Sequence, residues 1–311
     1  MHPISRSAAF VAAVSCSLAI AQPQIDYSKL TIKTTDLGHG VYLLGWQGGD
    51  SLILVGDDGV LLVDTSVAPM GDKIMAAIAK VSSKPIKLII NTHAHADHFG
   101  ANEALARGGA AIVAHVNLRE RMAKGQRIAA FNQTVPPSPA AALPTITYAE
   151  SMTLHFDGET IELFHPTNAH TDSDTLVHFE RANVIHASGT FGGDGSYPFF
   201  DMSSGGSLAG TIAAEEKMLS LADANTRIQA DEGDPASTAS LRECHDALVT
   251  IRGRVQKLID EGKSEDEAVA AKPTLDLDAR FVRPGAFLTG DAFTRMAYQS
   301  LKSGVSSPAA R

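Results

Sequence analysis

The sequence has few of the features that mark disulfide-stabilised, membrane-spanning or nucleic-acid-binding proteins. Two cysteines in 311 residues are too few for a disulfide framework. No cluster of lysine and arginine is present and the formal net charge is −9, which argues against nucleic acid as a partner. Beyond the N-terminal segment no apolar run approaches ~18 residues, so we expect no membrane span. No linker-like stretch divides the chain, which favours one large domain.

The N-terminus has the layout of a secretory signal peptide. A histidine and an arginine precede an apolar run from Ala8 to Ile20, and Ala19-Ile20-Ala21 has the small-x-small pattern of a cleavage site. We therefore expect residues 1–21 to be removed. The mature protein, residues 22–311, would then be periplasmic or secreted.

The two cysteines bear on the same prediction. Cys16 lies inside the apolar run and offers an alternative, a lipid anchor, although Ala13 stands where a leucine is usual. Cleavage would leave Cys244 without an intrachain partner. Because Cys244 lies in a strongly helical stretch, we expect a buried and inert thiol there.

Strands and helices alternate along the first half of the chain, and the second half opens with hairpins, which predicts a layered α/β fold. Strands are expected at residues 41–46, 51–55, 60–63, 85–90, 111–114, 152–156, 160–164, 175–179, 183–186 and 227–229. Helices are expected at residues 70–81, 101–107, 117–124, 208–222, 241–260 and 291–301, and a capping box at Ser264 predicts one more. Four prolines and no periodicity predict a loop or lip at residues 131–144.

The densest group of potential metal ligands is His93-Ala94-His95-Ala96-Asp97-His98, directly after the apolar strand 85–90. His93 and His95 alternate along a chain leaving the strand, so their side chains can point to the same side. Zinc favours imidazole and carboxylate ligands, and a catalytic zinc keeps a position open for water. Chance explains the group poorly, since the whole chain has only 12 histidines. The pattern therefore predicts a catalytic zinc site.

This pattern resembles the hallmark of the metallo-β-lactamase superfamily, His-x-His-x-Asp-His after a strand. Val63-Asp64-Thr65 is similar to the family's Val-Asp-Thr segment, and Ala169-His170-Thr171 is similar to its third metal-binding histidine. The resemblance implies an αββα sandwich, in which two mixed β-sheets are flanked by helices and the metals lie at one edge. A helical extension over about residues 237–311 would complete the domain.

The resemblance also implies five metal ligands, three for a first zinc and two for a second: His93, His95 and His170, then Asp97 and His98. Asp97 is in addition the candidate catalytic residue, which would orient the nucleophile and pass a proton to the leaving group. His165 and His186 match no ligand position, and we interpret them as structural.

Two departures from the family pattern affect the second metal. The family usually has Gly-Asp after the strand at 183–186, and this Asp bridges the metals, whereas the present chain has Ser188-Gly189. Class B β-lactamases also lack the Asp, but they keep a late histidine. Here the segment for that histidine reads Asp231-Glu232-Gly233-Asp234-Pro235. Either one of its three carboxylates replaces the histidine or the segment is a solvated acidic turn, and we expect one tight zinc with a second weak or absent.

The resemblance implies an exported zinc-dependent hydrolase in which metal-bound hydroxide opens a small amide or ester, such as a β-lactam ring. The substrate would be a small molecule. One alternative is a lactonase or thioesterase of the same fold, and another is a zinc-binding protein with lost or reduced catalysis. The missing bridging carboxylate argues against a di-iron redox centre.

Overall fold

The structure is a computed structural model that describes residues 25–46, 48–284, 286 and 288–304. The expected signal peptide and Cys16 lie outside the described residues. The described residues before Thr31, residues 25–30, belong to a separate unit and contain a short 3-10 helix, η1 (Tyr27–Lys29). The second unit begins at Thr31 and contains both large β-sheets.

The first sheet of this unit has seven strands in the order β1-β2-β3-β4-β5-β6-β9. The strands are β1 (Lys33–Gly38), β2 (Val41–Gly45), β3 (Ser51–Val55), β4 (Val60–Val63), β5 (Ile86–Ile90), β6 (Ala111–His115) and β9 (Ile146–Tyr148). Neighbours from β1 to β4 are antiparallel, and β4, β5, β6 and β9 run parallel to one another. The parallel strands deliver their carboxyl ends to a common edge, where β5 leads into the histidine-rich motif.

The second sheet has six strands in the order β10-β11-β12-β13-β14-β15. They are β10 (Ser151–Phe156), β11 (Glu159–Phe164), β12 (Leu176–Phe179), β13 (Val184–His186), β14 (Arg227–Gln229) and β15 (Ala236–Ser237). β13 and β14 are parallel, and the other neighbours are antiparallel. His186 pairs with Gln229, so the chain leaves β13 and β14 side by side.

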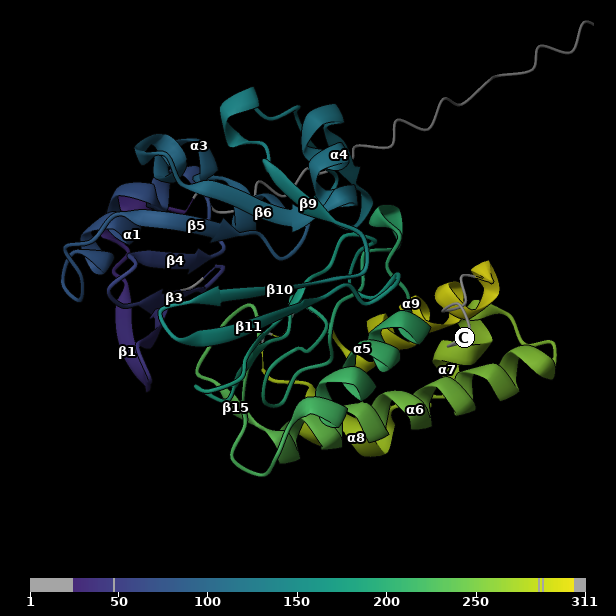
Figure 1. Cartoon of the computed structure of the whole chain (residues 1–311). Helices are drawn as coiled ribbons and strands as arrows, with labels where there is room; N and C mark the ends of the chain where they lie inside the picture. The colour runs from purple at the N-terminus through teal and green to yellow at the C-terminus, as the bar shows by residue number, and fades with distance from the viewer. Residues whose placement is uncertain (1–24, 47, 285, 287, 305–311) are drawn as a thin grey trace, which may run out of the picture. The chain divides into compact units, whose positions relative to one another are not determined.

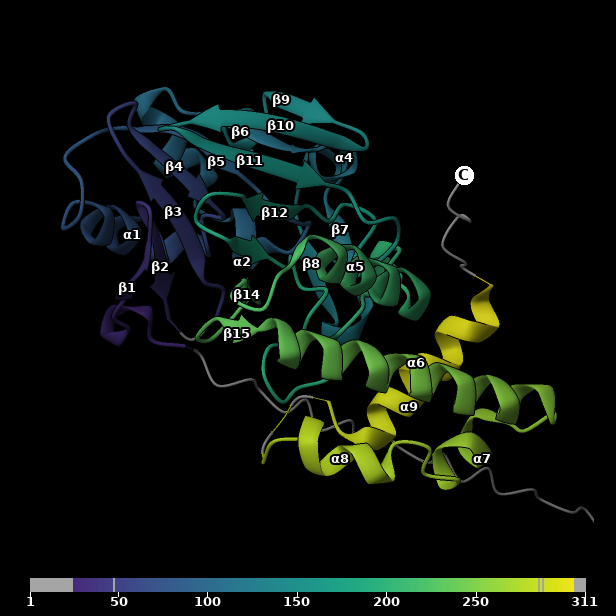
Figure 2. The same cartoon turned by 60° about the horizontal axis from the view of Figure 1, so that its bottom comes forward.

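The two sheets pack face to face, and helices cover their outer faces (Figure 1). Side chains alternate along a strand, and β13 shows the result: Val184 belongs to the core between the sheets, whereas Ile185 packs against the helices. On the first sheet lie α1 (Gly71–Ile78), α3 (Asn102–Leu105) and α4 (Val116–Lys124), and on the second lie α5 (Leu208–Leu221), α6 (Thr238–Asp260) and α9 (Gly290–Ser303). Figure 2 shows α5, α6 and α9 grouped on one side of the second sheet. This is the expected αββα sandwich.

Most expected elements are present within a few residues of their bounds, including α7 (Glu265–Ala270), which opens with the expected capping box at Ser264. The expectation of a loop at residues 131–144 is corrected, because β8 (Gln133–Val135) forms a hairpin with β7 (Gln126–Ile128) and η5 (Ala140–Ala142) follows. Ile128 and Val135 are buried in a hydrophobic cluster beneath α4, and this packing stabilises the two short strands. The sequence patterns also missed β1, β9, β15 and α8 (Leu275–Phe281).

Two further expectations concern the described part of the chain. Cys244 is buried in α6 and forms no disulfide. None of the described helices combines the length and the apolar character needed to cross a bilayer.

Candidate metal centre

The motif after β5 places two histidines at the edge of the first sheet. β5 ends at Ile90, and His95 is the extended N-cap residue of α2 (Ala96–Phe99). His93 is fully buried and His95 is 7% exposed. The bend at residues 93–95 before the helix therefore places both imidazoles inside the protein rather than in solvent.

The third histidine comes from the second sheet. His170 lies in the connection between β11 and β12, and its ring is buried. The backbone N–H of Asp201 donates to the His170 carbonyl at 2.7 Å, and that of Ser207 donates to the Ala169 carbonyl at 2.8 Å. The segment that precedes α5 thus holds this connection in place.

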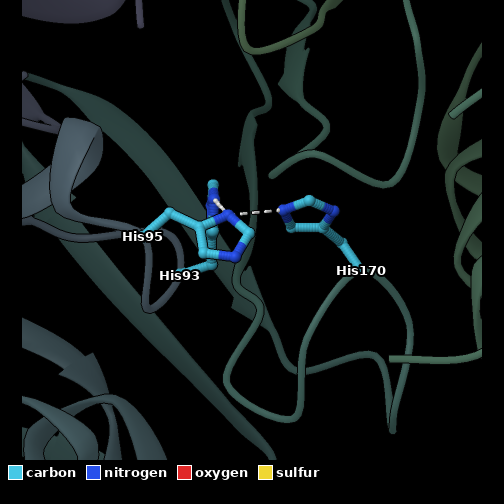
Figure 3. A group of neighbouring side chains, drawn as sticks. All are labelled: His93, His95 and His170. Carbon is cyan, nitrogen blue, oxygen red and sulfur yellow. Dashed lines mark hydrogen bonds between the residues drawn. The ribbon is translucent and has the colours of Figure 1, made fainter. Parts of the chain in front are cut away.

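The three imidazoles converge on one point (Figure 3). His95 Nδ1 lies 3.2 Å from His93 Nε2 and 3.0 Å from His170 Nε2. The His95 and His170 rings meet at 89°, edge to face. A tetrahedral zinc holds imidazole nitrogens at about 2.0–2.1 Å, which places two of them about 3.3 Å apart. The observed spacing therefore fits a zinc ion bound by these three nitrogens.

The opposite nitrogen of each ring has an acceptor, which fixes the tautomer. The three acceptors are Thr92 Oγ1 at 3.1 Å from His93 Nδ1, Asp201 Oδ2 at 3.2 Å from His95 Nε2, and the Phe199 carbonyl at 2.6 Å from His170 Nδ1. When these nitrogens carry the proton, the lone pairs of the other three face the centre. Such partners orient metal-binding histidines and raise their basicity.

Burial keeps two of these rings neutral. It lowers the pKa of His93 well below its usual value and the pKa of His170 to about 3, and the neighbouring imidazoles lower both further. Neutral imidazole is the form that binds a metal. At neutral pH the cluster is therefore ready to bind a cation without first losing protons from these rings.

A second group surrounds His98, the last residue of the motif. Its Nδ1 donates to Asp64 Oδ2 at 2.7 Å, while its Nε2 faces Asp97 Oδ2 at 3.7 Å and Asp231 Oδ2 at 3.9 Å. Burial lowers the pKa of His98, but the carboxylates of Asp231, Asp64 and Asp97 outweigh it and raise the pKa to about 10. Three carboxylates around one buried ring make this position strongly attractive to a cation.

Asp231 is the late carboxylate that faces the centre. Its ligand atom lies within 4.8 Å of those of His93 and His98. Glu232 is exposed, and Asp234 forms an exposed ion pair with Lys33 at 3.0 Å. Among the three candidates for the place of the missing histidine, the structure thus favours Asp231.

Ser188 and the two histidines interpreted as structural, His165 and His186, lie outside both groups. Ser188 turns away from the centre, because its hydroxyl donates to the Thr92 carbonyl at 3.2 Å. His165 stacks on His115 with ring centroids 3.6 Å apart, and its Nδ1 donates to the Asp174 carbonyl. His186 is buried and accepts a hydrogen bond from the Ser188 backbone.

Sequence patterns missed the residues that orient the histidines. Asp64 lies in the Val-Asp-Thr segment, which indicated the family but not its contact with His98. Asp201 carried no distinguishing signal beyond the serines that follow it, both of which donate to its carboxylate. The carbonyl of Phe199 could not be found at all, since any residue supplies a carbonyl.

Comparison with known proteins assigns the chain to a family. The model of the metallo-β-lactamase superfamily matches residues 44–238, and the chain belongs to this superfamily. A metallo-β-lactamase type 2 from Bacillus sp. (strain 170) is 26% identical over 185 residues, which is 56% of this chain and 66% of that protein. The 2,4-dinitroanisole O-demethylase subunit alpha from Nocardioides sp. (strain JS1661) is 28% identical over 144 residues, 45% of this chain and 40% of that protein. The matches therefore span less than two thirds of either relative.

Solved structures share the fold at low sequence identity. The sec-alkylsulfatase Pisa1 from Pseudomonas sp. has a TM-score of 0.65 at 17% identity, over 86% of this chain and 50% of its own. A metallo-β-lactamase from Pontibacter korlensis has a TM-score of 0.55 at 18% identity, over 70% of this chain and 99% of its own. These likenesses establish the architecture and leave the substrate to be proposed.

Proposed function

We propose that this protein is a zinc-dependent hydrolase that opens a small amide or ester, with β-lactams as the first substrate class to test. The observation that carries the proposal is the convergence of His93, His95 and His170, whose nitrogens have the spacing of a zinc site. A zinc bound there would supply an activated water and polarise the carbonyl that is attacked.

Asp97 is placed to move a proton at the mouth of the site. Its side chain is 45% exposed, while His98 beneath it is buried. A carboxylate that faces both solvent and the centre can accept a proton from the attacking water and deliver it to the leaving nitrogen or oxygen. Asp97 is therefore our candidate catalytic residue.

An aromatic wall, Phe131 and Phe199, lies beside the site. The Phe199 ring packs edge-on against His170 at 5.8 Å, and Phe131 lies 5.5 Å from Phe199 and is 40% exposed. Phe131 belongs to the β7–β8 hairpin, which the Ala129 N–H anchors to Ser203 Oγ at 3.0 Å. An exposed aromatic ring in this position suits the apolar side of a small substrate.

The metal content proposed here is one tight zinc and a weaker second one. The first group offers three buried imidazoles, which zinc binds well. The second has one imidazole and the carboxylates of Asp97 and Asp231, which lie in closer reach of solvent. We therefore expect the first ion to remain bound through purification and the second to bind only at raised zinc concentration.

The test combines metal analysis with a substrate panel. The full chain and a His170→Ala control would be assayed with a chromogenic cephalosporin, a lactone, a thioester, a sulfate ester and a nitroanisole. We expect zinc-dependent hydrolysis of the cephalosporin or another carbonyl substrate, lost in the control and after chelation. Cleavage of the sulfate ester or the nitroanisole alone would refute a carbonyl substrate. A zinc-loaded protein that hydrolyses nothing would instead indicate a binding protein.

We also propose that the protein is exported. The supporting observation is the apolar run at Ala8–Ile20 followed by a small-x-small site. N-terminal sequencing of protein made in its native host should begin near Gln22. A cytosolic chain that begins at Met1 would contradict export.

A further inference from the structure

Gly189 leaves space beside the metal centre because it has no side chain. It follows β13 and has a φ of +71°, in the left-handed region that favours glycine. A Cβ at this position would lie 2.6 Å from His170 Cδ2 and 2.8 Å from Asp231 Oδ2. Neither distance is possible for a real Cβ, so a side chain at residue 189 and the present positions of His170 and Asp231 exclude each other.

Asp231 fills this space from the neighbouring strand. β13 and β14 are parallel and leave the sheet side by side, with His186 paired to Gln229. Asp231 lies two residues beyond the end of β14, and Gly189 lies three residues beyond the end of β13. Its backbone is pinned by Asp50, whose N–H donates to the Asp231 carbonyl at 2.8 Å and whose Oδ2 accepts from the Gly233 N–H at 2.9 Å. The loop therefore holds the carboxylate in one place.

The contacts of the Asp231 carboxylate with the described part of the chain leave one of its buried oxygens without a hydrogen bond. Its Oδ1 is buried and has no hydrogen-bond partner among the described residues. Its Oδ2 faces His98 Nε2 at 3.9 Å, with Asp97 close by on the same nitrogen. A buried oxygen without a donor is costly unless a cation or an ordered water meets it.

We propose that Asp231 supplies the carboxylate of the second metal site from the end of β14, and that Gly189 at the end of β13 is the glycine this placement requires. The two positions are reciprocal, since only one of them can bring a side chain to the space beside His170. The ion would be a divalent cation such as zinc, bound by Asp97, His98 and Asp231. This inference rests on the proposed zinc-dependent function and specifies its second site.

The experiment is calorimetric titration of the metal-free full chain with zinc chloride, with the thermal unfolding temperature as a second measurement. The wild type should show a tight event and a weaker one. Asp231→Asn should lose the weaker event and keep the tight one, which also shows that the variant is folded. Asp234→Asn, which changes a neighbouring exposed carboxylate, is its matched control and should titrate like the wild type.

Gly189→Ala tests the reciprocity. Its Cβ should displace Asp231 and press on His170, so that the weaker event is lost and the tight one is weakened. Gly262→Ala is the control for backbone strain, because Gly262 has a φ of +76° and nothing within 4 Å of a Cβ. The double variant with Asp231→Asn should lack the weaker event, as Asp231→Asn alone does, and should show the same weakening of the tight event as Gly189→Ala alone.

The outcomes separate this inference from the function it rests on. A weaker event that survives in Asp231→Asn, or a wild type with the tight event alone, would overturn the second site while leaving the first intact. Equal effects of Gly189→Ala and Gly262→Ala would overturn the role of Gly189. A wild type that binds no zinc would refute the proposed function itself.

Discussion

Replacement of Asp201 by asparagine should lower the affinity of the first, tight zinc site without removing any of its ligands. Asp201 Oδ2 lies 3.2 Å from His95 Nε2, on the side of the ring away from the centre. Burial raises the pKa of Asp201, but its contacts with His95, Ser203 and Ser204 outweigh this and hold the pKa well below the usual value. The group is therefore a carboxylate at neutral pH, and it stabilises the tautomer of His95 that binds metal.

The expected loss follows from the type of contact. A hydrogen bond to a charged group contributes about 1.5–3 kcal/mol, and the amide oxygen of asparagine retains part of it. Removing the partner of a metal-bound histidine typically costs about 10–100-fold in metal affinity, which corresponds to about 1.4–2.7 kcal/mol. The two ranges agree, so we expect the zinc dissociation constant of Asp201→Asn to rise about 10- to 100-fold.

Competition with a chromogenic chelator would measure this change in the purified full chain. Ser203→Ala is the matched control, because the Ser203 hydroxyl donates to Asp201 Oδ1 and not to the oxygen that contacts His95. It should bind zinc within about twofold of the wild type, well below the loss expected at the histidine contact. If Asp201→Asn also stays within twofold, the contact to His95 does not support the metal and our account of this side of the site fails.

Three further predictions follow from the same structure. His170→Ala should lose the tight zinc and all hydrolysis, because it removes one of three imidazole ligands; elemental analysis and the substrate panel check this, and retained metal would contradict it. Phe131→Ala should raise KM several-fold and leave kcat nearly unchanged if its exposed ring contacts the substrate, whereas a fall in kcat alone would exclude that role. Burial lowers the pKa of His115 from 6.5 to about 4 in the folded protein. As the pH falls below 6.5, His115 is therefore protonated in the unfolded chain before it is protonated in the folded one. The contribution of neutral His115 to the free energy of unfolding is complete above pH 6.5 and is lost as the pH falls toward 4. The difference between the two pKa values corresponds to about 3 kcal/mol. The urea concentration at the midpoint of unfolding should therefore fall as the pH is lowered from 6.5 to 4, and His115→Gln should make this midpoint less dependent on pH.

The parts of the fold that could be predicted from the sequence are those with local signals. The apolar runs of β3, β4 and β5 and the capping box of α7 are visible in a few consecutive residues. The hairpin β7–β8 and the two-residue strand β15 are too short for any periodicity, and tertiary contacts alone hold them. The same limit explains why the sequence alone predicts a loop at residues 131–144.

The candidate site divides in the same way. His93, His95 and His170 stand in recognisable local patterns, and the structure brings them together. The selection of Asp231 among three nearby carboxylates depends on Asp50, a residue far away in the sequence that pins the loop. Asp201 meets His95 across 106 residues of sequence, and no local pattern could reveal that contact.

The separation of the three histidines along the chain has a consequence for folding. His95 belongs to the first sheet and His170 to the second, 75 residues further on. An ion held by both binds the docked sheets and not the unfolded chain, so it stabilises the folded state by about 4 kcal/mol when the free ion is at about 1,000 times its dissociation constant. The native spacing of the nitrogens arises only after the two sheets have docked, so the ion favours the docked state over every partly folded one. The expected mature form has a single cysteine and so no intrachain disulfide, and a bound metal would link the two halves of the sandwich in its place.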